Sequence, residues 1–288
     1  MVTTRALFRL RLRDGSVRLA AGSPEDGPAT LLDAALSIDG LLAAGGGELW
    51  ERVAASGGAG AVPAGATILA PIETQPVWAA GVTYERSRVE REAESVSAAD
   101  VYALVYDAER PELFFKSAGD RVVGPGDGIG VRRDSAWNAP EPELVIVVNA
   151  GMEPVGFTAG NDVSSRSIEG ENPLYLPQAK VYERSCALGP CIVAWADVAL
   201  PAEIRLSVSR GGSTVFEGRT STAAIHRRLE DLVAWLGRAM AFDWGCFLMT
   251  GTGIVPPESF SLTAGDEVSV TIEGIGVLRN PVVDVGRA

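Results

Sequence analysis

Two glutamates separated by a single proline begin an apolar stretch near the middle of the chain, Glu141-Pro142-Glu143-Leu144-Val145-Ile146-Val147-Val148. The uninterrupted aliphatic residues predict a buried strand, and side chains two positions apart on a strand point to the same face. Glu141 and Glu143 are therefore predicted to lie about 6.5 Å apart. Two carboxylates this close repel each other unless a cation lies between them. The pair indicates either a metal site or two solvated glutamates at the start of a strand.

A metal at this position would have mainly oxygen ligands available. Asp162 follows a second predicted strand, residues 155–159, and could supply a third carboxylate. The chain has one histidine and three cysteines without a CxxC pair, which leaves little material for zinc or copper. Hard oxygen ligands favour Mg²⁺, with Mn²⁺ or Ca²⁺ as alternatives. Mg²⁺ also keeps positions for water, which a chelating 2-oxo acid can displace.

Lysine is rare in this chain. Lys and Arg together number 25, yet lysine occurs only at Lys116 and Lys180. Lysine carries a compact amine that can lose its proton, whereas arginine stays charged. The two positions therefore indicate either chemistry or chance survival. The single histidine, His226, lies in a predicted helix and is assigned no role.

Composition and charge restrict the class of protein. The chain has 288 residues, 47% of them hydrophobic and 22% charged, as in an ordinary globular protein. Its net charge of −12 argues against nucleic acid or an anionic membrane as a partner. Its odd number of cysteines disfavours a disulfide framework. No stretch is apolar enough to span a bilayer and the first residues lack a signal-peptide pattern, so we expect a cytoplasmic protein.

The elements that must position these residues fall into two predicted domains. Residues 1–65 predict a small α/β domain with a hairpin (8–12 and 17–21) and helices at 31–44 and 48–55. Residues 66–288 predict a β-rich domain, because short strands alternate with Gly, Pro and Asp turns from residue 113 onward. Two helical features interrupt it: a partly exposed arm at 86–108 and an amphipathic helix at 221–240.

Four motifs occur in the order typical of the fumarylacetoacetate hydrolase superfamily, and the chain resembles that superfamily from about residue 71 to its end. They are Gly124-Pro125-Gly126-Asp127, Glu141-Pro142-Glu143-Leu144, Gly160-Asn161-Asp162-Val163-Ser164-Ser165-Arg166 and Thr250-Gly251-Thr252-Gly253. The resemblance implies an α+β fold with a β-rich roll, and a Mg²⁺ held by Glu141, Glu143 and Asp162. It also matches Lys180 to an active-site lysine and Thr252 to a threonine that contacts substrate.

Three further segments resemble the branch of this superfamily that dehydrates 2-keto-3-deoxy-D-arabinonate. They are Gly81-Val82-Thr83-Tyr84-Glu85-Arg86-Ser87, Arg110-Pro111-Glu112-Leu113-Phe114-Phe115-Lys116 and Glu169-Gly170-Glu171-Asn172-Pro173-Leu174-Tyr175-Leu176-Pro177-Gln178. Hydrolytic members of the superfamily carry a histidine where this chain has Ser87. A serine cannot act as a general base at neutral pH without a partner base, so this departure disfavours hydrolysis of a C–C bond.

The resemblance implies a Mg²⁺-dependent hydro-lyase that converts 2-keto-3-deoxy-D-arabinonate to 2,5-dioxopentanoate (2-oxoglutarate semialdehyde) and water in pentose catabolism. The metal would chelate the carboxylate and the 2-oxo group and stabilise an enolate. Lys180 and Glu112 are the candidate acid and base, in either order. The candidate substrate contacts are Tyr84, Arg86, Ser87 and Thr252. A homo-oligomer, dimer or tetramer, is also expected.

Two alternatives stay open at this point. The first is a Mg²⁺-dependent acylpyruvate hydrolase or oxaloacetate decarboxylase, which would need a substitute base, for example within residues 86–94. The second is a sugar-acid or metal-binding protein without catalytic activity. The presence of all three carboxylates and both candidate acid and base residues argues against this second alternative.

Overall fold

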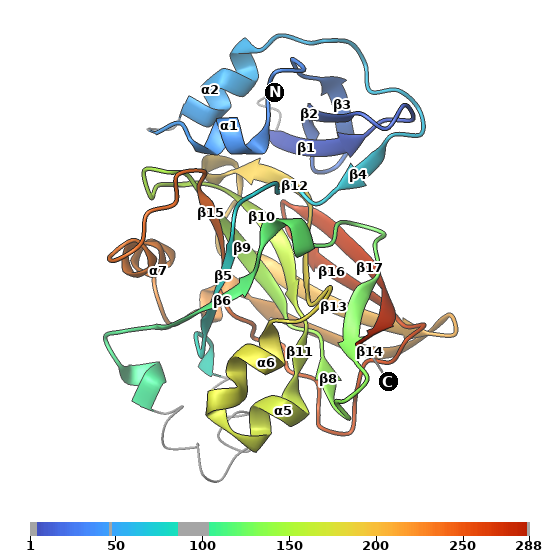
Figure 1. The fold of residues 1–288 in the computed structure, drawn as a ribbon, viewed down its shortest axis with the longest axis vertical. Helices are drawn as coiled ribbons and strands as arrows, with labels where there is room; N and C mark the ends of the chain where they lie inside the picture. The colour runs from blue at the N-terminus through green and yellow to red at the C-terminus, as the bar shows by residue number, and fades with distance from the viewer. Residues whose placement is uncertain (1–4, 46–47, 86–103, 287–288) are drawn as a thin grey trace.

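The computed structural model describes residues 5–45, 48–85 and 104–286. Most of its strands belong to one large mixed sheet. These strands are β1 (Ala6–Arg11), β2 (Val17–Ser23), β3 (Gly27–Leu31), β4 (Thr67–Leu69), β5 (Val77–Gly81), β6 (Glu112–Ser117), β9 (Pro142–Val148), β10 (Pro154–Asp162), β12 (Cys186–Ala194) and β15 (Cys246–Met249). Their order is β3-β2-β1-β12-β10-β9-β15-β5-β6, with β4 paired to β1 (Figure 1).

A second sheet has the order β14-β13-β16-β17-β7. It consists of β7 (Ile129–Arg132), β13 (Glu203–Arg210), β14 (Ser213–Ser221), β16 (Glu267–Ile272) and β17 (Gly276–Val285), and a short pair is formed by β8 (Asn138–Ala139) and β11 (Ser164–Ser165). The described helices are α1 (Ile38–Leu42), α2 (Glu48–Ala55), α5 (Arg166–Glu171), α6 (Leu176–Lys180) and α7 (Leu229–Leu236), with 3-10 turns η1 (Gly119–Arg121), η2 (Pro173–Tyr175), η3 (Trp195–Asp197) and η4 (Thr222–Ala224). The fold is therefore α+β and rich in strands, as the sequence predicted.

Strand β9 lies in the middle of the large sheet and is buried on both faces. Leu144, Ile146 and Val148 belong to the core that includes residues of the second sheet. Val145 and Val147 belong to the core that includes residues of α1 and α2. Burial on both faces requires apolar residues at every position, which explains the unbroken aliphatic run. The predicted strand is confirmed, and it fixes the two glutamates at its beginning.

The N-terminal strands extend the large sheet, because β1 pairs with β12 through Ala6↔Val193 and Leu7↔Ile192. Helices α1 and α2 lie beside these strands at one end of the molecule (Figure 1). The division into domains at residues 65 and 66 stays a prediction. The hairpin of β1 and β2 and the helix at residues 48–55 are confirmed.

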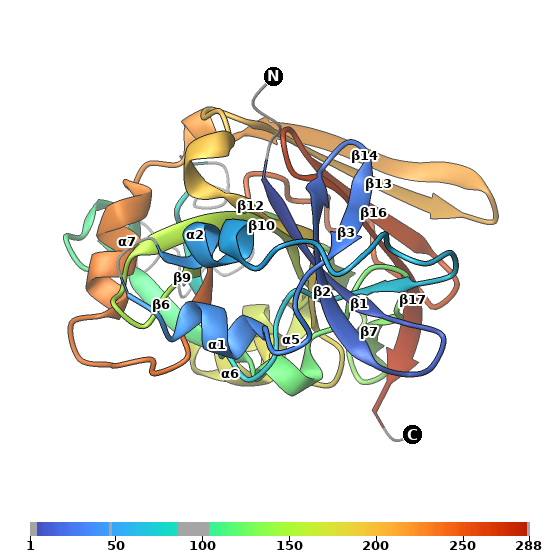
Figure 2. The same ribbon diagram turned by 90° about the horizontal axis from the view of Figure 1, so that it is seen from above.

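Two predicted helices are much shorter than the sequence pattern suggested. Within residues 221–240 the α-helix is only α7, preceded by the turn η4, because residues up to Ser221 belong to β14. Within residues 31–44 the helix is only α1, which begins where Ser37 accepts a hydrogen bond from Gly40 N at 3.0 Å. Figure 2 shows α7 on one side of the molecule and the β13–β14 hairpin extending from the opposite side.

The predicted arm falls mostly on residues 86–103, outside the described residues, and residues 104–107 form one helical turn. Among the described residues, no helix has the length and apolarity needed to cross a bilayer.

Candidate active site

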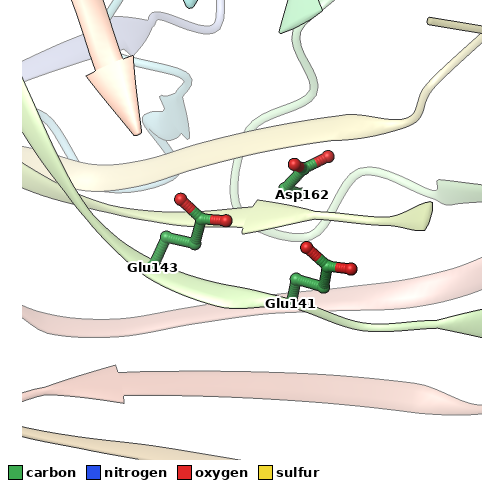
Figure 3. A group of neighbouring side chains, drawn as sticks. All are labelled: Glu141, Glu143 and Asp162. Carbon is green, nitrogen blue, oxygen red and sulfur yellow. The ribbon is translucent and has the colours of Figure 1, made fainter. Parts of the chain in front are cut away.

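The three predicted metal ligands come together at the β9–β10 hairpin. Glu143 pairs with Gly160 across the antiparallel strands, and Asp162 N donates to Glu141 O at 2.9 Å. Opposed residues of antiparallel strands point to the same face, so this register brings Asp162 beside the glutamates. One carboxylate oxygen from each residue lies within 4.8 Å of the others, and all three side chains are buried (Figure 3). The prediction that these carboxylates share one location is confirmed.

Both lysines of the chain contact this cluster. Lys180, at the end of α6, places Nζ 2.8 Å from Glu141 Oε2 and 2.9 Å from Asp162 Oδ2. Lys116, on β6, places Nζ 2.5 Å from the other oxygen, Asp162 Oδ1. Lys116 also donates to Lys180 O at 2.6 Å and to Val163 O at 3.1 Å. Lys116 thus makes two hydrogen bonds and one ion pair although its side chain is fully buried.

Arg166 supplies a third buried cation. Its Nη2 lies 2.9 Å and its Nε 3.1 Å from Glu141 Oε1, so both guanidinium atoms contact one oxygen. Arg166 is the first residue of α5 and follows the short strand β11. Glu141 is consequently held by Arg166 on one oxygen and by Lys180 on the other, which fixes the plane of its carboxylate.

Glu143 has a different environment from its two neighbours. Its Oε2 accepts a hydrogen bond from Gly251 N at 2.6 Å. Burial raises the pKa of Glu143 well above its usual range, and the charges of Asp162 and Glu141 raise it further, against the opposing effects of Lys180 and the Gly251 N–H. Because burial and like charges both destabilise its ionised form, a bound cation would stabilise the Glu143 carboxylate strongly.

Glu112, the second candidate for acid–base chemistry, begins β6 opposite Gly81. An added Cβ at Gly81 would lie 1.9 Å from Glu112 Oε2, so glycine is required for the carboxylate to pack over β5. Alternation along β6 puts Glu112 on the face of Phe114. The Phe114 ring lies 5.5 Å from Lys180 Nζ. Glu112 thus shares a strand face with Phe114, a residue next to the carboxylate cluster.

Tyr84 and Thr252, two of the predicted substrate contacts, lie in adjacent buried turns. An added Cβ at Gly253 would lie 2.5 Å from Tyr84 Cδ1, which shows how closely these turns approach. Burial and the charge of Glu143 raise the pKa of Tyr84, so its phenol stays a hydrogen-bond donor at neutral pH. Thr252 Oγ1 bonds to the backbone of Ile254. Arg86 and Ser87 lie outside the described residues.

Sequence reasoning assigned no role to two of the residues at this site, Lys116 and Arg166. The scarcity of lysine was a signal for Lys116 as much as for Lys180. Arg166 stood within a motif already noted beside Asp162. Neither residue could be paired with its carboxylate without the three-dimensional arrangement.

Comparison with known proteins gives concordant results. The model of the fumarylacetoacetate (FAA) hydrolase C-terminal region matches residues 76–283. The chain is 52% identical over 217 residues to a probable 2-keto-3-deoxyxylonate dehydratase of Haloferax volcanii, which covers 75% of this chain and 74% of the relative. It is 42% identical over 220 residues to the 2-dehydro-3-deoxy-D-arabinonate dehydratase of Saccharolobus solfataricus, with 75% and 74% covered.

A solved structure of 2-keto-3-deoxy-D-arabinonate dehydratase complexed with magnesium and 2,5-dioxopentanoate is similar over almost the whole chain. Its TM-score is 0.83 at 32% sequence identity, and the match covers 98% of this chain and 100% of that one.

Proposed function

Because the chain belongs to the fumarylacetoacetate hydrolase family, we propose that it is a Mg²⁺-dependent dehydratase that converts 2-keto-3-deoxy-D-arabinonate to 2,5-dioxopentanoate and water. The observation that carries this proposal is the buried cluster of Glu141, Glu143 and Asp162 with Lys180 bonded to two of its members. The relatives that support it are dehydratases of 2-keto-3-deoxy acids, and the similar solved structure holds magnesium and the dioxo product.

The names of the two relatives are consistent with one substrate. Forming a 2-keto-3-deoxy acid removes the stereocentres at C2 and C3 of a pentonate and leaves only C4. D-arabinonate and D-xylonate have the same configuration at C4, so their 2-keto-3-deoxy derivatives are one compound. The substrate is therefore defined by its five-carbon chain and by the configuration at C4.

The three carboxylates fit a hard divalent cation. Their oxygens are close enough to share one ion, they are buried, and the described cluster contains no sulfur or nitrogen ligand. We assign Mg²⁺ first, with Mn²⁺ or Ca²⁺ as the alternatives. When bound, the ion would supply Lewis-acid polarisation of the substrate's 2-oxo group, which makes the C3 protons more acidic.

The chain's own residues would move the protons. Dehydration removes a proton from C3 and the hydroxyl group from C4, which leaves as water once it is protonated. We assign these two transfers to Lys180 and Glu112, and we assign substrate positioning to Tyr84 and Thr252. The resulting enone must then shift a proton from C5 before the aldehyde forms, so one of the two groups acts twice. Arg86 and Ser87 stay predicted contacts.

A three-substrate assay tests the proposed function. The protein is incubated with Mg²⁺ and 2-keto-3-deoxy-D-arabinonate, an acylpyruvate or oxaloacetate, and products are followed by NMR. We expect 2,5-dioxopentanoate from the first substrate. Cleavage of the acylpyruvate or loss of CO₂ from oxaloacetate, without dehydration, would instead support the hydrolase or decarboxylase. Binding of the sugar acid without turnover would support a non-catalytic protein.

Proton exchange at C3 in D₂O separates the acid from the base. The variant that lacks the base, Lys180→Met or Glu112→Gln, should lose both exchange and dehydration. The variant that lacks the acid should keep exchange and lose dehydration. Glu109→Gln, a change at an exposed acid near Glu112, is the matched control. Borohydride added during turnover tests a Schiff base on Lys180, because a trapped adduct would replace direct polarisation of the 2-oxo group.

The remaining expectations are a cytoplasmic location, a homo-oligomer and a separate N-terminal domain. We keep all three as proposals. Sedimentation velocity would distinguish the predicted dimer or tetramer from a monomer, and expression of residues 66–288 alone would test whether this part folds by itself.

A further inference from the structure

A short stretch before α7, residues 225–227, contacts the chain on both sides of residues 86–103. We call it the 225–227 segment. It contains His226, the one histidine of the chain. Tyr84 precedes residues 86–103 in the sequence, and Glu112 follows them. Both belong to the proposed site.

The segment forms backbone contacts with the residues that precede 86–103. Ile225 forms an antiparallel bridge with Tyr84, and His226 N donates to Thr83 O at 2.9 Å. Thr83 Oγ1 in turn donates to Thr250 O at 2.6 Å, next to the Gly251 N–H that binds Glu143. The backbone that carries Tyr84 is thus fixed between the 225–227 segment and the turn beside Glu143.

The segment also forms hydrogen bonds with the residues that follow 86–103, at the end of the helical turn of residues 104–107. Arg227 Nη2 donates to Val105 O at 3.0 Å and to Ala108 O at 2.7 Å, and its Nη1 donates to Glu109 O at 3.2 Å. Carbonyls at and just after the end of a helical turn have no partner within the turn, and the guanidinium supplies donors to three of them: that of Val105 in the turn and those of Ala108 and Glu109 after it. The His226 ring also stacks on Tyr106, with centroids 4.5 Å apart and planes inclined by 23°.

The stretch held by Arg227 forms one wall of a pocket of about 400 Å³. Val105, Ala108, Arg110 and Glu112 line one side, and Pro173 and Leu176 line the other. Leu176 and Lys180 lie four residues apart on α6, so they share a helix face. Glu112 therefore lines the pocket directly, and Lys180 lies one helical turn beyond the lining residue Leu176. The volume of the pocket suits a small ligand.

We propose that His226 and Arg227 are positioning residues that hold Tyr84 and the Glu112 wall at the spacing the substrate requires. This inference rests on the proposed function. The 225–227 segment joins Tyr84 to the Glu112 wall, although the two are separated in sequence, and the contacts described do not involve the metal ligands. Loss of the contacts made by the 225–227 segment should weaken substrate binding and leave metal binding intact.

Arg227→Met removes the donors and keeps most of the aliphatic stem. We expect KM for 2-keto-3-deoxy-D-arabinonate to rise about tenfold, with kcat and Mg²⁺ affinity changed less than about twofold. Hydrogen exchange of the amides of residues 104–112 should accelerate in the same variant. Arg228→Met is the matched control, because Arg228 is exposed and its described ion pair with Glu230 is long, at 3.8 Å. Equal KM values for Arg227→Met and wild type would overturn the proposal.

Two substitutions of His226 test whether its ring contributes by stacking on Tyr106. His226→Phe keeps an aromatic plane and should retain a KM close to that of wild type, whereas His226→Ala should raise it. The same KM in both variants would overturn the role of the stack. The hydrogen-exchange measurement needs no substrate. Inactive wild-type protein would therefore overturn the proposed function, while unchanged exchange in Arg227→Met would overturn the positioning role.

Discussion

Lys116 and Lys180 hold opposite oxygens of the same carboxylate, with Lys116 Nζ 2.5 Å from Asp162 Oδ1 and Lys180 Nζ 2.9 Å from Asp162 Oδ2. Lys116 also donates to the backbone oxygen of Lys180. The two lysines are therefore not equivalent. Lys180 reaches the cluster from the end of a helix, and Lys116 orients both Asp162 and the residue that carries the second ammonium group.

Lys116→Met should make the metal-free protein less stable and more responsive to metal. The change leaves Asp162 Oδ1 without its buried cation, which costs about 3 kcal/mol. The two backbone oxygens each keep a donor, Ser185 Oγ for Lys180 O and the Tyr182 hydroxyl for Val163 O. A bound cation restores a positive charge next to Asp162. We therefore expect Mg²⁺ to raise the melting temperature more in Lys116→Met than in wild type, measured by thermal unfolding with EDTA or Mg²⁺. An equal rise in both proteins would contradict this role for Lys116.

Glu143→Gln should separate metal binding from folding. Glutamine keeps an oxygen for the Gly251 N–H, and it removes the charge that is repelled by Asp162 and Glu141. We expect the metal-free variant to be at least as stable as wild type, to show no thermal shift with Mg²⁺, and to lose dehydration. Glu267→Gln, at an exposed glutamate on β16, is the control. A variant that keeps its metal-induced shift would remove Glu143 from the metal site.

Metal binding should release protons. Burial and like charges raise the pKa of Glu143 in the metal-free protein, whereas a metal ligand must be ionised. Between the ordinary and the raised pKa the free site is protonated, so Mg²⁺ displaces a proton and its affinity increases with pH. Above the raised pKa the affinity levels off. Calorimetric titration in two buffers of different ionisation enthalpy, repeated at several pH values, gives the proton count. A count of zero at every pH above the ordinary pKa of glutamate would contradict the assignment.

The carboxylate cluster could be predicted because its geometry is local. Glu141 and Glu143 share a strand face by their spacing alone, and Asp162 ends the next strand along the chain. The contact of Lys116 with Asp162 is different in kind. Lys116 lies at the edge of the large sheet, and its position depends on the register shift between β5 and β6 at Val77 and Trp78. No pattern of residue types encodes that register.

The helix predicted at residues 221–240 illustrates a second limit. Its apolar spacing was real, since Leu232, Val233 and Leu236 are buried in α7. Spacing does not show where backbone hydrogen bonds go, and Ser221 pairs with Glu203 at the end of β14. The same limit applies to β1, whose partner β12 is distant in sequence, so the continuous sheet could not be foreseen from two predicted domains.

An ion pair between the buried Asp266, just before β16, and the half-exposed Arg210 of β13 should control acid stability. Asp266 accepts from Arg210 Nε at 2.7 Å, from Arg210 Nη2 at 2.9 Å and from Thr263 N at 3.0 Å. Burial opposes ionisation, but the bonds from Arg210 and Thr263 outweigh it and lower the pKa of Asp266. A carboxyl with a lowered folded pKa contributes stability above its unfolded pKa, and this stability is lost as pH falls through the folded value.

Asp266→Asn should therefore lose about 2 kcal/mol of unfolding free energy at neutral pH, since the half-exposed Arg210 is partly screened by water. The difference from wild type should shrink as pH falls through the lowered pKa of Asp266, because wild type then loses the same charge. Urea unfolding at neutral and acidic pH measures both values, with Asp284→Asn, a change at an exposed carboxylate paired to Arg133, as the control. A constant difference at both pH values would mean that Asp266 acts through packing, independent of its charge.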